Sequence, residues 1–192
     1  MSTVVMHAVV SVDGFIAGLD DEVGPLFDWY GNGDVEIVEN GPFRVSQASA
    51  DYVRPMWASI RSMVIGRHLF DITDGWNASP PAGEYVVVVS HRPKPDGWHP
   101  EASYHFVDDV TRAISVAREL AGDGVVALAA GEVGGQAFAL GLVDEVAMDV
   151  APVVFGSGKR YFGKVDSQHL LDDPTTVIKG DRVLHLRYRV RR

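Results

Sequence analysis

The chain has 192 residues, with 17 lysines and arginines against 26 aspartates and glutamates, which gives a net charge of −9 at neutral pH. This length accommodates one domain with a complete hydrophobic core, and we expect residues 1–192 to form a single domain. The acidic balance argues against a nucleic-acid or membrane-surface partner, because contacts with many phosphates require a basic face, and the absence of cysteine excludes disulfides and thiol chemistry.

The first residues lack the basic flank and the long apolar region of a signal peptide, and no apolar run approaches the roughly 18 residues of a transmembrane helix. We therefore expect a cytoplasmic protein. The seven histidines show no spacing typical of a zinc site, so we expect no catalytic metal.

The first third of the chain is predicted to contain a central strand, a long loop and a helix. Residues 4–12 are nearly all apolar, which is typical of a strand buried on both faces, and Asp13-Gly14 follows as a turn. Residues 20–41 are rich in glycine, which predicts a loop with at most a short turn at 27–30. The apolar spacing of residues 46–60 predicts a helix that Pro55 kinks or begins.

Strands and helices alternate through the middle of the chain. Short apolar runs predict strands at 62–65, 85–89, 104–107 and 125–129, and one helical turn is predicted at 67–70. Apolar residues at helical spacing predict helices at 110–120, after the acidic caps Asp108 and Asp109, and at 133–140. This alternation indicates right-handed crossovers and a parallel sheet.

The last third of the chain is predicted to be mainly extended. Strands are expected at 146–150 and 153–155, followed by an antiparallel hairpin of 175–178 and 183–190. Even-numbered residues from Leu184 to Val190 are apolar and odd-numbered residues from His185 to Arg191 are basic, which predicts one buried and one solvated face. The predicted fold class is therefore α/β, with three layers (αβα) around a mostly parallel sheet that ends in an antiparallel hairpin.

Two predicted strand ends carry side chains suited to a phosphate, Gly66-Arg67-His68 and Ser90-His91-Arg92. A glycine lets the chain turn tightly, and a guanidinium binds phosphate through paired hydrogen bonds. Because ligands of open α/β sheets bind beyond the carboxyl ends of the strands, the two segments together predict a site for one phosphate. The alternative is that both arginines simply lie on surface turns.

A third strand end, Ala130-Gly131-Glu132-Val133-Gly134-Gly135, joins a strand to a helix through small residues. Free N–H groups at that helix N-terminus would suit a diphosphate, and close packing of helix on sheet is the alternative explanation. Glu132 stabilises the start of the helix but would repel a phosphate placed beside it. The glycine spacing does not fit the dinucleotide-binding fingerprint, and residues 153–160 do not fit a phosphate loop.

Two acids are candidate proton donors. Asp51 lies on the helix after the long loop, where a partly apolar cleft would raise the pKa of its carboxyl, and the alternative is a solvated surface residue. Asp13 follows the first strand, and there a simple Asp-Gly turn is the preferred explanation.

Four segments in this order resemble the dihydrofolate reductase-like family. More closely, they are similar to its branch that contains the reductase domain of bacterial riboflavin biosynthesis and stand-alone relatives. They are SVDGFIA at 11–17, VIGRHLF at 64–70, VSHR at 89–92, and GLVDE at 141–145 followed by APVVFGSGKRYF at 151–162.

The resemblance implies NADPH as cofactor. It implies that Val9, Ile16 and Ala17 line the nicotinamide, that Gly66-Arg67-His68 and Ser90-His91-Arg92 hold the adenosine 2′-phosphate, and that residues 130–135 receive the diphosphate. The family usually has two glycines where Ala130 and Gly131 stand here, and the alanine narrows the space beside the diphosphate.

The resemblance also implies a reductase of the 5-amino-6-(5-phosphoribosylamino)uracil reductase type. Its substrate would lie between Phe27, Trp29, Tyr30 and the helix of Asp51. Reduction of a pterin, with Asp51 as the matching acid, and an NADP-binding protein without turnover, favoured by Ala130 and Glu132, are the alternatives. A homodimer formed through the C-terminal antiparallel strands is an expectation at the level of the family.

Overall fold

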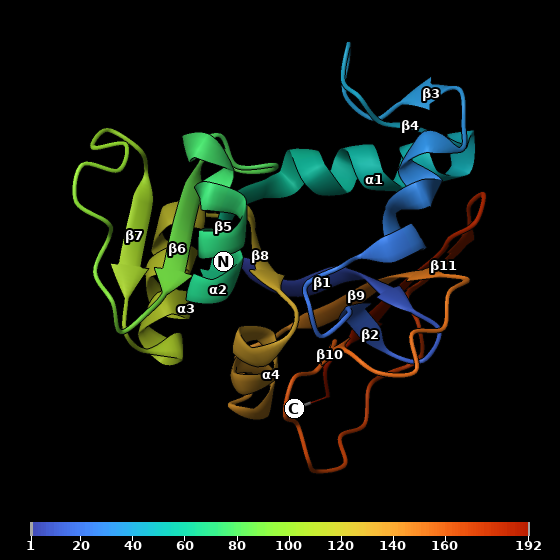
Figure 1. Cartoon of the computed structure of the whole chain (residues 1–192). Coiled ribbons are helices and arrows are strands. Elements are labelled where there is room, and N and C mark those ends of the chain that lie inside the picture. Colours follow the sequence, from blue (N-terminus) through green and yellow to red (C-terminus); the bar gives the residue numbers. More distant parts are fainter. Residues whose placement is uncertain (1, 192) are drawn as a thin grey trace.

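An eight-stranded sheet forms the centre of the computed structural model, which describes residues 2–191 (Figure 1). The strand order is β11-β12-β9-β1-β8-β5-β6-β7. Neighbours from β9 to β7 pair in parallel, whereas β12 pairs antiparallel with β9 and β11 with β12. The strands are β1 Thr3–Ser11, β5 Ile60–Gly66, β6 Tyr85–Val89, β7 Tyr104–Val107, β8 Val125–Ala129, β9 Glu145–Ala151, β11 Thr176–Lys179 and β12 Leu184–Arg189.

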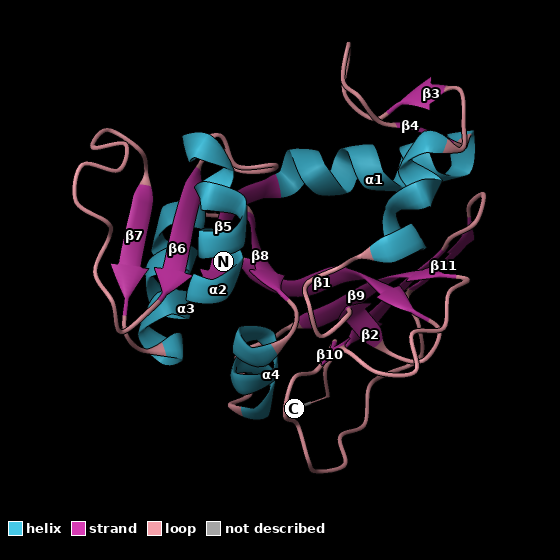
Figure 2. Cartoon of the chain, viewed as in Figure 1, coloured by secondary structure: helices cyan, strands magenta, loops and turns pink. Residues whose placement is uncertain are grey.

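Helices cover both faces of this sheet, as Figure 2 shows. Two short ribbons, β2 with β10 and β3 with β4, lie outside it. The helices are α1 Gln47–Ser59, α2 Arg67–Thr73, α3 Val110–Ala121, α4 Glu132–Ala139 and the 3-10 helices η1 Gly24–Gly31 and η2 Asp74–Ala78, and the ribbons are β2 Phe15–Ala17, β3 Val35–Glu36, β4 Arg44–Val45 and β10 Lys159–Arg160.

Burial on both faces explains why the central strands are almost continuously apolar. Val10 of β1 belongs to the cluster under α3 and α4, whereas its neighbour Val9 belongs to the cluster under α1 and η1. In β5, Val64 and Ile65 divide in the same way between the α3 side and the α2 side. The predicted three-layer α/β class with a C-terminal antiparallel hairpin is confirmed.

Several predicted elements have the predicted bounds. The strands at 85–89, 104–107 and 125–129 are confirmed to the residue. The helix expected after the acidic caps begins at Val110, because the Asp109 carboxylate accepts a hydrogen bond from the backbone N–H of Arg112 at 2.8 Å. Helix α1 begins after Ser46 and continues through Pro55.

Three expectations about local structure were wrong. Residues 153–155 form a loop, because the Val153 N–H donates to the carbonyl of Ala151 only two residues earlier, at 2.8 Å, and the Phe155 N–H donates to the Asp13 carboxylate at 3.1 Å. The segment 20–41 contains η1, which Leu26 and Trp29 anchor in the core. His185, predicted on a solvated face, is fully buried because α1 covers that face of β12.

None of the helices within residues 2–191 is both long and apolar enough to cross a bilayer.

Gly135→Ala tests the close packing of α4. A Cβ at Gly135 would overlap the backbone carbonyl oxygen of Phe162, and backbone on both sides leaves little room to shift. We expect a loss of about 3 kcal/mol in the free energy of unfolding, or ~6–12 °C in Tm. Thermal unfolding measures it, with the exposed neighbour Gln136→Ala as the control; equal stability of the two variants contradicts the packing.

Candidate functional site

A cleft of about 800 Å³ opens where the parallel strands β1, β5 and β8 end. This is the edge of an open α/β sheet at which ligands bind. Predicted site residues that line the cleft are Val9, Ile16, Ala17, Phe27, Tyr30, Gly66, His68, Ala130, Gly131, Glu132 and Val133. Residues that the sequence prediction missed also line it, among them His7, Asp21, Lys159, Arg160 and Lys164.

The start of α4 forms one wall of the cleft. Gly131, the residue before the helix, has φ of 94° and ψ of −146°, a conformation that favours glycine, and no side chain caps this helix end. The backbone N–H groups of the first turn are therefore suited to an anion. Glu132 lies 3.5 Å from the Nζ of Lys164, and both side chains are exposed, so its charge is only partly balanced by this lysine.

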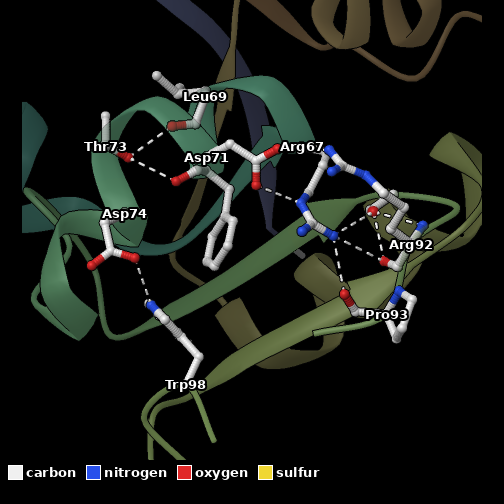
Figure 3. Close-up of polar contacts among 10 residues, drawn as sticks. Arg67, Leu69, Asp71, Thr73, Asp74, Arg92, Pro93 and Trp98 are labelled. Carbon is white, nitrogen blue, oxygen red and sulfur yellow. Dashed lines mark hydrogen bonds and ion pairs between the residues drawn. The ribbon is translucent and has the colours of Figure 1, made fainter. Parts of the chain in front are cut away.

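A cluster of two arginines and one aspartate lies beside the cleft (Figure 3). The Asp71 carboxylate accepts from Arg67 Nε at 2.7 Å and from Arg92 at 2.6 Å. Arg67 also donates to the Pro93 carbonyl at 3.0 Å and to Ser90 Oγ at 3.4 Å. The hydrogen bond from Arg67 and then that from Arg92 hold the pKa of Asp71 below its usual range. Two guanidinium groups share one carboxylate, which leaves the cluster positive.

A second charged cluster stands at the cleft wall between β10 and α2. The Asp21 carboxylate accepts from Lys159 Nζ, and it lies 2.8 Å from His68 Nε2. The hydrogen bond from Lys159, followed by the one from His68, lowers the pKa of Asp21. The cluster ties the loop after β2 to the two elements on either side of the cleft.

A buried chain of polar side chains leads away from the cleft floor. His7 Nε2 lies 2.8 Å from Asp149 Oδ2, the second oxygen Oδ1 lies 2.6 Å from His185 Nδ1, and His185 Nε2 lies 2.9 Å from Ser49 Oγ. Asp149 and His185 are 1% and 0% exposed, whereas the His7 side chain is 24% exposed and borders the cleft. Burial alone would raise the pKa of Asp149, but the two histidines outweigh it and lower that pKa to about 2.

The sequence contains one signal for this series of hydrogen-bonded side chains. Asp149 stands inside the apolar strand 145–151, and a charge on a buried strand requires a partner. The register of the neighbouring strands brings the partners to Asp149, because Asp149 pairs with Val9 of β1 on one side and with His185 of β12 on the other. His7, two residues before Val9, is on the same face of the sheet.

The other predicted residues lie outside the cleft. The exposed Asp13 carboxylate accepts from Ser11 Oγ at 2.6 Å and from the Gly156 N–H at 2.7 Å, so it closes a turn, and the hydrogen bond from Ser11 lowers its pKa. Asp51 is exposed in a separate depression and accepts from Gln47 at 2.6 Å. Trp29, Gly134 and Gly135 are buried in packing contacts, and His91 is exposed.

A comparison of the sequence with models of protein families finds no match, and a comparison with curated proteins finds none either.

Solved structures do match the fold. A putative riboflavin biosynthesis protein from Shewanella sp. PV-4 aligns over 100% of both chains with a TM-score of 0.72 and 18% identity. A diaminohydroxyphosphoribosylaminopyrimidine deaminase/5-amino-6-(5-phosphoribosylamino)uracil reductase from Thermotoga maritima aligns over 99% of this chain and 57% of its own, with a TM-score of 0.62 and 13% identity. Dihydrofolate reductase from Enterococcus faecalis, complexed with NADP(H), aligns over 99% of this chain and 97% of its own, with a TM-score of 0.57 and 15% identity. The chain therefore has the dihydrofolate reductase-like fold.

Asp149→Asn tests the buried carboxylate through the pH dependence of stability. A folded pKa of about 2, below the ordinary 3.8, contributes stability that is present above pH ~4 and is lost as the pH falls toward 2. Urea unfolding between pH 6 and pH 3 should show the variant less stable at pH 6, by about 2 kcal/mol from this source, with the difference narrowing in acid. Asp108→Asn, at an exposed site, is the control, and a pH-independent difference contradicts the assignment.

Proposed function

We propose that this protein is an NADPH-dependent reductase of the 5-amino-6-(5-phosphoribosylamino)uracil reductase type. One observation carries the proposal. A single cleft borders both the uncapped start of α4 and an apolar wall of β1 and β2, and the positive Arg67–Asp71–Arg92 cluster lies beside it. A dinucleotide has the same sequence of parts, which are a charged end, a diphosphate and a flat ring.

The residues present fit the cofactor. Gly131 supports this fit, because a Cβ there would come within 3.3 Å of Ile16 Cδ1 and would narrow the space for a diphosphate beside the start of α4. The backbone of residues 131–133 would hold the diphosphate, and Arg67, Ser90 and Arg92 would hold the 2′-phosphate. Val9, Ile16 and Ala17 would line the nicotinamide, which when bound supplies a hydride.

Two features of the substrate side support a pyrimidine that carries a sugar phosphate. The rings of Phe27 and Tyr30 provide a surface for a flat heterocycle, and their centroids lie 5.9 Å apart. Lys159, Arg160 and Lys164 line the same cleft, and because only Lys159 and Lys164 pair with carboxylates of the described residues, those of Asp21 and Glu132, the positive charge of Arg160 is left to suit a phosphate group. Reduction of a pterin is the weaker candidate, because Asp51, the acid expected to anchor it, lies in a separate depression.

Cofactor preference tests the arginine cluster. Wild type should bind NADPH at least ~10-fold more tightly than NADH, because each charge-assisted hydrogen bond to the 2′-phosphate contributes about 1.5–3 kcal/mol. Arg67→Gln and Arg92→Gln should each reduce that preference and leave NADH affinity unchanged. Tryptophan fluorescence titration measures both affinities, with the exposed Arg112→Gln on α3 as the matched control. Equal wild-type affinities for the two cofactors would remove the basis of the proposal.

Asp71→Asn should have the opposite effect. The Asp71 carboxylate occupies the guanidinium N–H groups of Arg67 and Arg92 that a 2′-phosphate would use, and its charge repels that phosphate. We expect NADPH affinity to rise about 5-fold with little change for NADH. Asp96→Asn, at an exposed residue three positions after Pro93, controls for long-range charge. Weaker NADPH binding by Asp71→Asn would show that the carboxylate serves only to orient Arg67.

Turnover is tested directly by mixing the protein with NADPH and either 5-amino-6-(5-phosphoribosylamino)uracil or dihydrofolate, and by following the loss of NADPH absorbance. Oxidation with the pyrimidine alone supports the proposal. Oxidation with dihydrofolate alone supports the pterin reductase instead. Tight NADPH binding without turnover identifies a binding protein, which is the alternative that Ala130 and Glu132 favour.

A further inference from the structure

His7 is the titratable side chain that joins the cleft to the buried polar chain. It borders the cleft beside Ala8 and Val9, and its Nε2 is held by Asp149 at 2.8 Å. Within residues 2–191, the structure gives its Nδ1 no hydrogen-bond partner. The imidazole is thus fixed through one nitrogen, and the other is left for a ligand.

The hydrogen bonds assign the tautomers. Asp149 is an acceptor through both oxygens, so His7 Nε2 and His185 Nδ1 must both carry protons. In a neutral His185 ring, Nε2 then accepts from the Ser49 hydroxyl, which in turn accepts from Ser46 Oγ at 3.2 Å. Neutral His7 therefore has an unprotonated Nδ1. This is the state left after a proton has been given to a ligand in the cleft.

We infer that His7 is the proton donor of the reaction, and that Asp149 and His185 are positioning residues that act through it. The inference rests on the proposed function and goes beyond it, because it assigns the protonation step to a residue that neither the sequence motifs nor the cofactor site indicates. An aspartate that holds one imidazole nitrogen fixes the ring, sets its tautomer and stabilises the imidazolium.

The step balances in atoms and charge. Bound NADPH would supply two electrons as a hydride to the carbon of a substrate C=N or C=O bond and would leave as NADP⁺. The π electrons of that bond move to the nitrogen or oxygen, which takes the proton from His7 Nδ1. His7 becomes neutral and keeps its Nε2 proton, which stays hydrogen-bonded to Asp149. Because the side chain is 24% exposed, water can return a proton to Nδ1.

Several other titratable groups near His7 are buried or already engaged. Burial raises the pKa of Tyr30 far above its usual range, and that of Tyr161 also, so both phenols keep their protons. Tyr161 also uses its hydroxyl to donate to the Met6 carbonyl at 2.7 Å. His68 and Lys159 are engaged with Asp21. Asp149 stays ionised and His185 is enclosed by the rings of Trp29 and Tyr52, at centroid distances of 5.2 and 4.8 Å.

The first test compares wild type with His7→Asn and His7→Ala in NADPH oxidation with 5-amino-6-(5-phosphoribosylamino)uracil. We expect kcat to fall about 100-fold or more while NADPH affinity stays within ~2-fold, which also shows that the variants are folded. Wild-type kcat/KM should fall at high pH, as expected of a reaction that needs a protonated general acid, and that slope should vanish in both variants. Added imidazole should restore about 10-fold of the lost rate in His7→Ala only. His105→Asn, an exposed histidine on β7, should match wild type.

The second test needs no turnover. With ¹⁵N-labelled histidine, NMR should show neutral His7 protonated at Nε2, and Asp149→Asn should shift the proton toward Nδ1. Adding NADP⁺ and 5-amino-6-(5-phosphoribosylamino)uracil, which together cannot react, should move the His7 Nδ1 resonance and leave that of His105 in place.

Failure of the inference and failure of the proposed function give different results. If wild type oxidises NADPH and His7→Asn keeps its kcat and pH profile, the role of His7 is overturned and the reductase stands. If wild type oxidises nothing and the Nδ1 resonance does not respond to the two ligands, both are overturned. If wild type oxidises nothing but the resonance moves, the reductase is overturned, and so is proton donation by His7 to a substrate.

Discussion

Tyr161 makes four hydrogen bonds on which the geometry of the cleft depends. Its single hydroxyl proton is shared between the carbonyls of Met6 at 2.7 Å and Ala147 at 2.9 Å, which joins β1 to β9. Its backbone N–H donates to Gly14 at 2.9 Å, and its carbonyl accepts from the Gly131 N–H at 2.7 Å. One buried residue therefore fixes the turn after β1, the start of α4 and the strand beside His7. The start of α4 and the strand beside His7, which come from distant parts of the sequence, are therefore held at a fixed distance from each other.

The sequence predicts the regular elements well because their causes are local. Burial on both faces makes β6 and β8 continuously apolar, and the carboxylate of Asp109 sets the start of α3, so periodicity and capping are sufficient there. The errors occur where a distant residue decides the outcome. Residues 153–155 have the composition of a strand, but Asp13, about 140 positions earlier in the chain, accepts hydrogen bonds from the N–H groups of Phe155 and of the following Gly156. His185 alternates like a solvated residue, but α1 covers it.

The same distinction between local and long-range causes applies to the residues of the site. The candidate cofactor residues follow strand ends, and a strand followed by glycine and arginine is visible in a short window of sequence, so Gly66, His68 and Gly131 were found and do line the cleft. The His7–Asp149–His185 chain arises from the register of three strands that are far apart in the sequence. Neither composition nor spacing reveals that register. The two predicted acids were sought on turns and helices, whereas the acid–histidine pair lies within the sheet.

Asp71 and Asp149 each stand between two cationic or basic groups, and their different exposure gives them different properties. Asp71, with its side chain 37% exposed, lies between Arg67 and Arg92, where water competes for every hydrogen bond and a phosphate can replace the carboxylate. Asp149, 1% exposed, lies between His7 and His185, where no solvent replaces a lost partner and the geometry is fixed. An exchangeable carboxylate suits a binding site that must open for its ligand. A fixed one suits a proton donor that must keep a single orientation through each turnover.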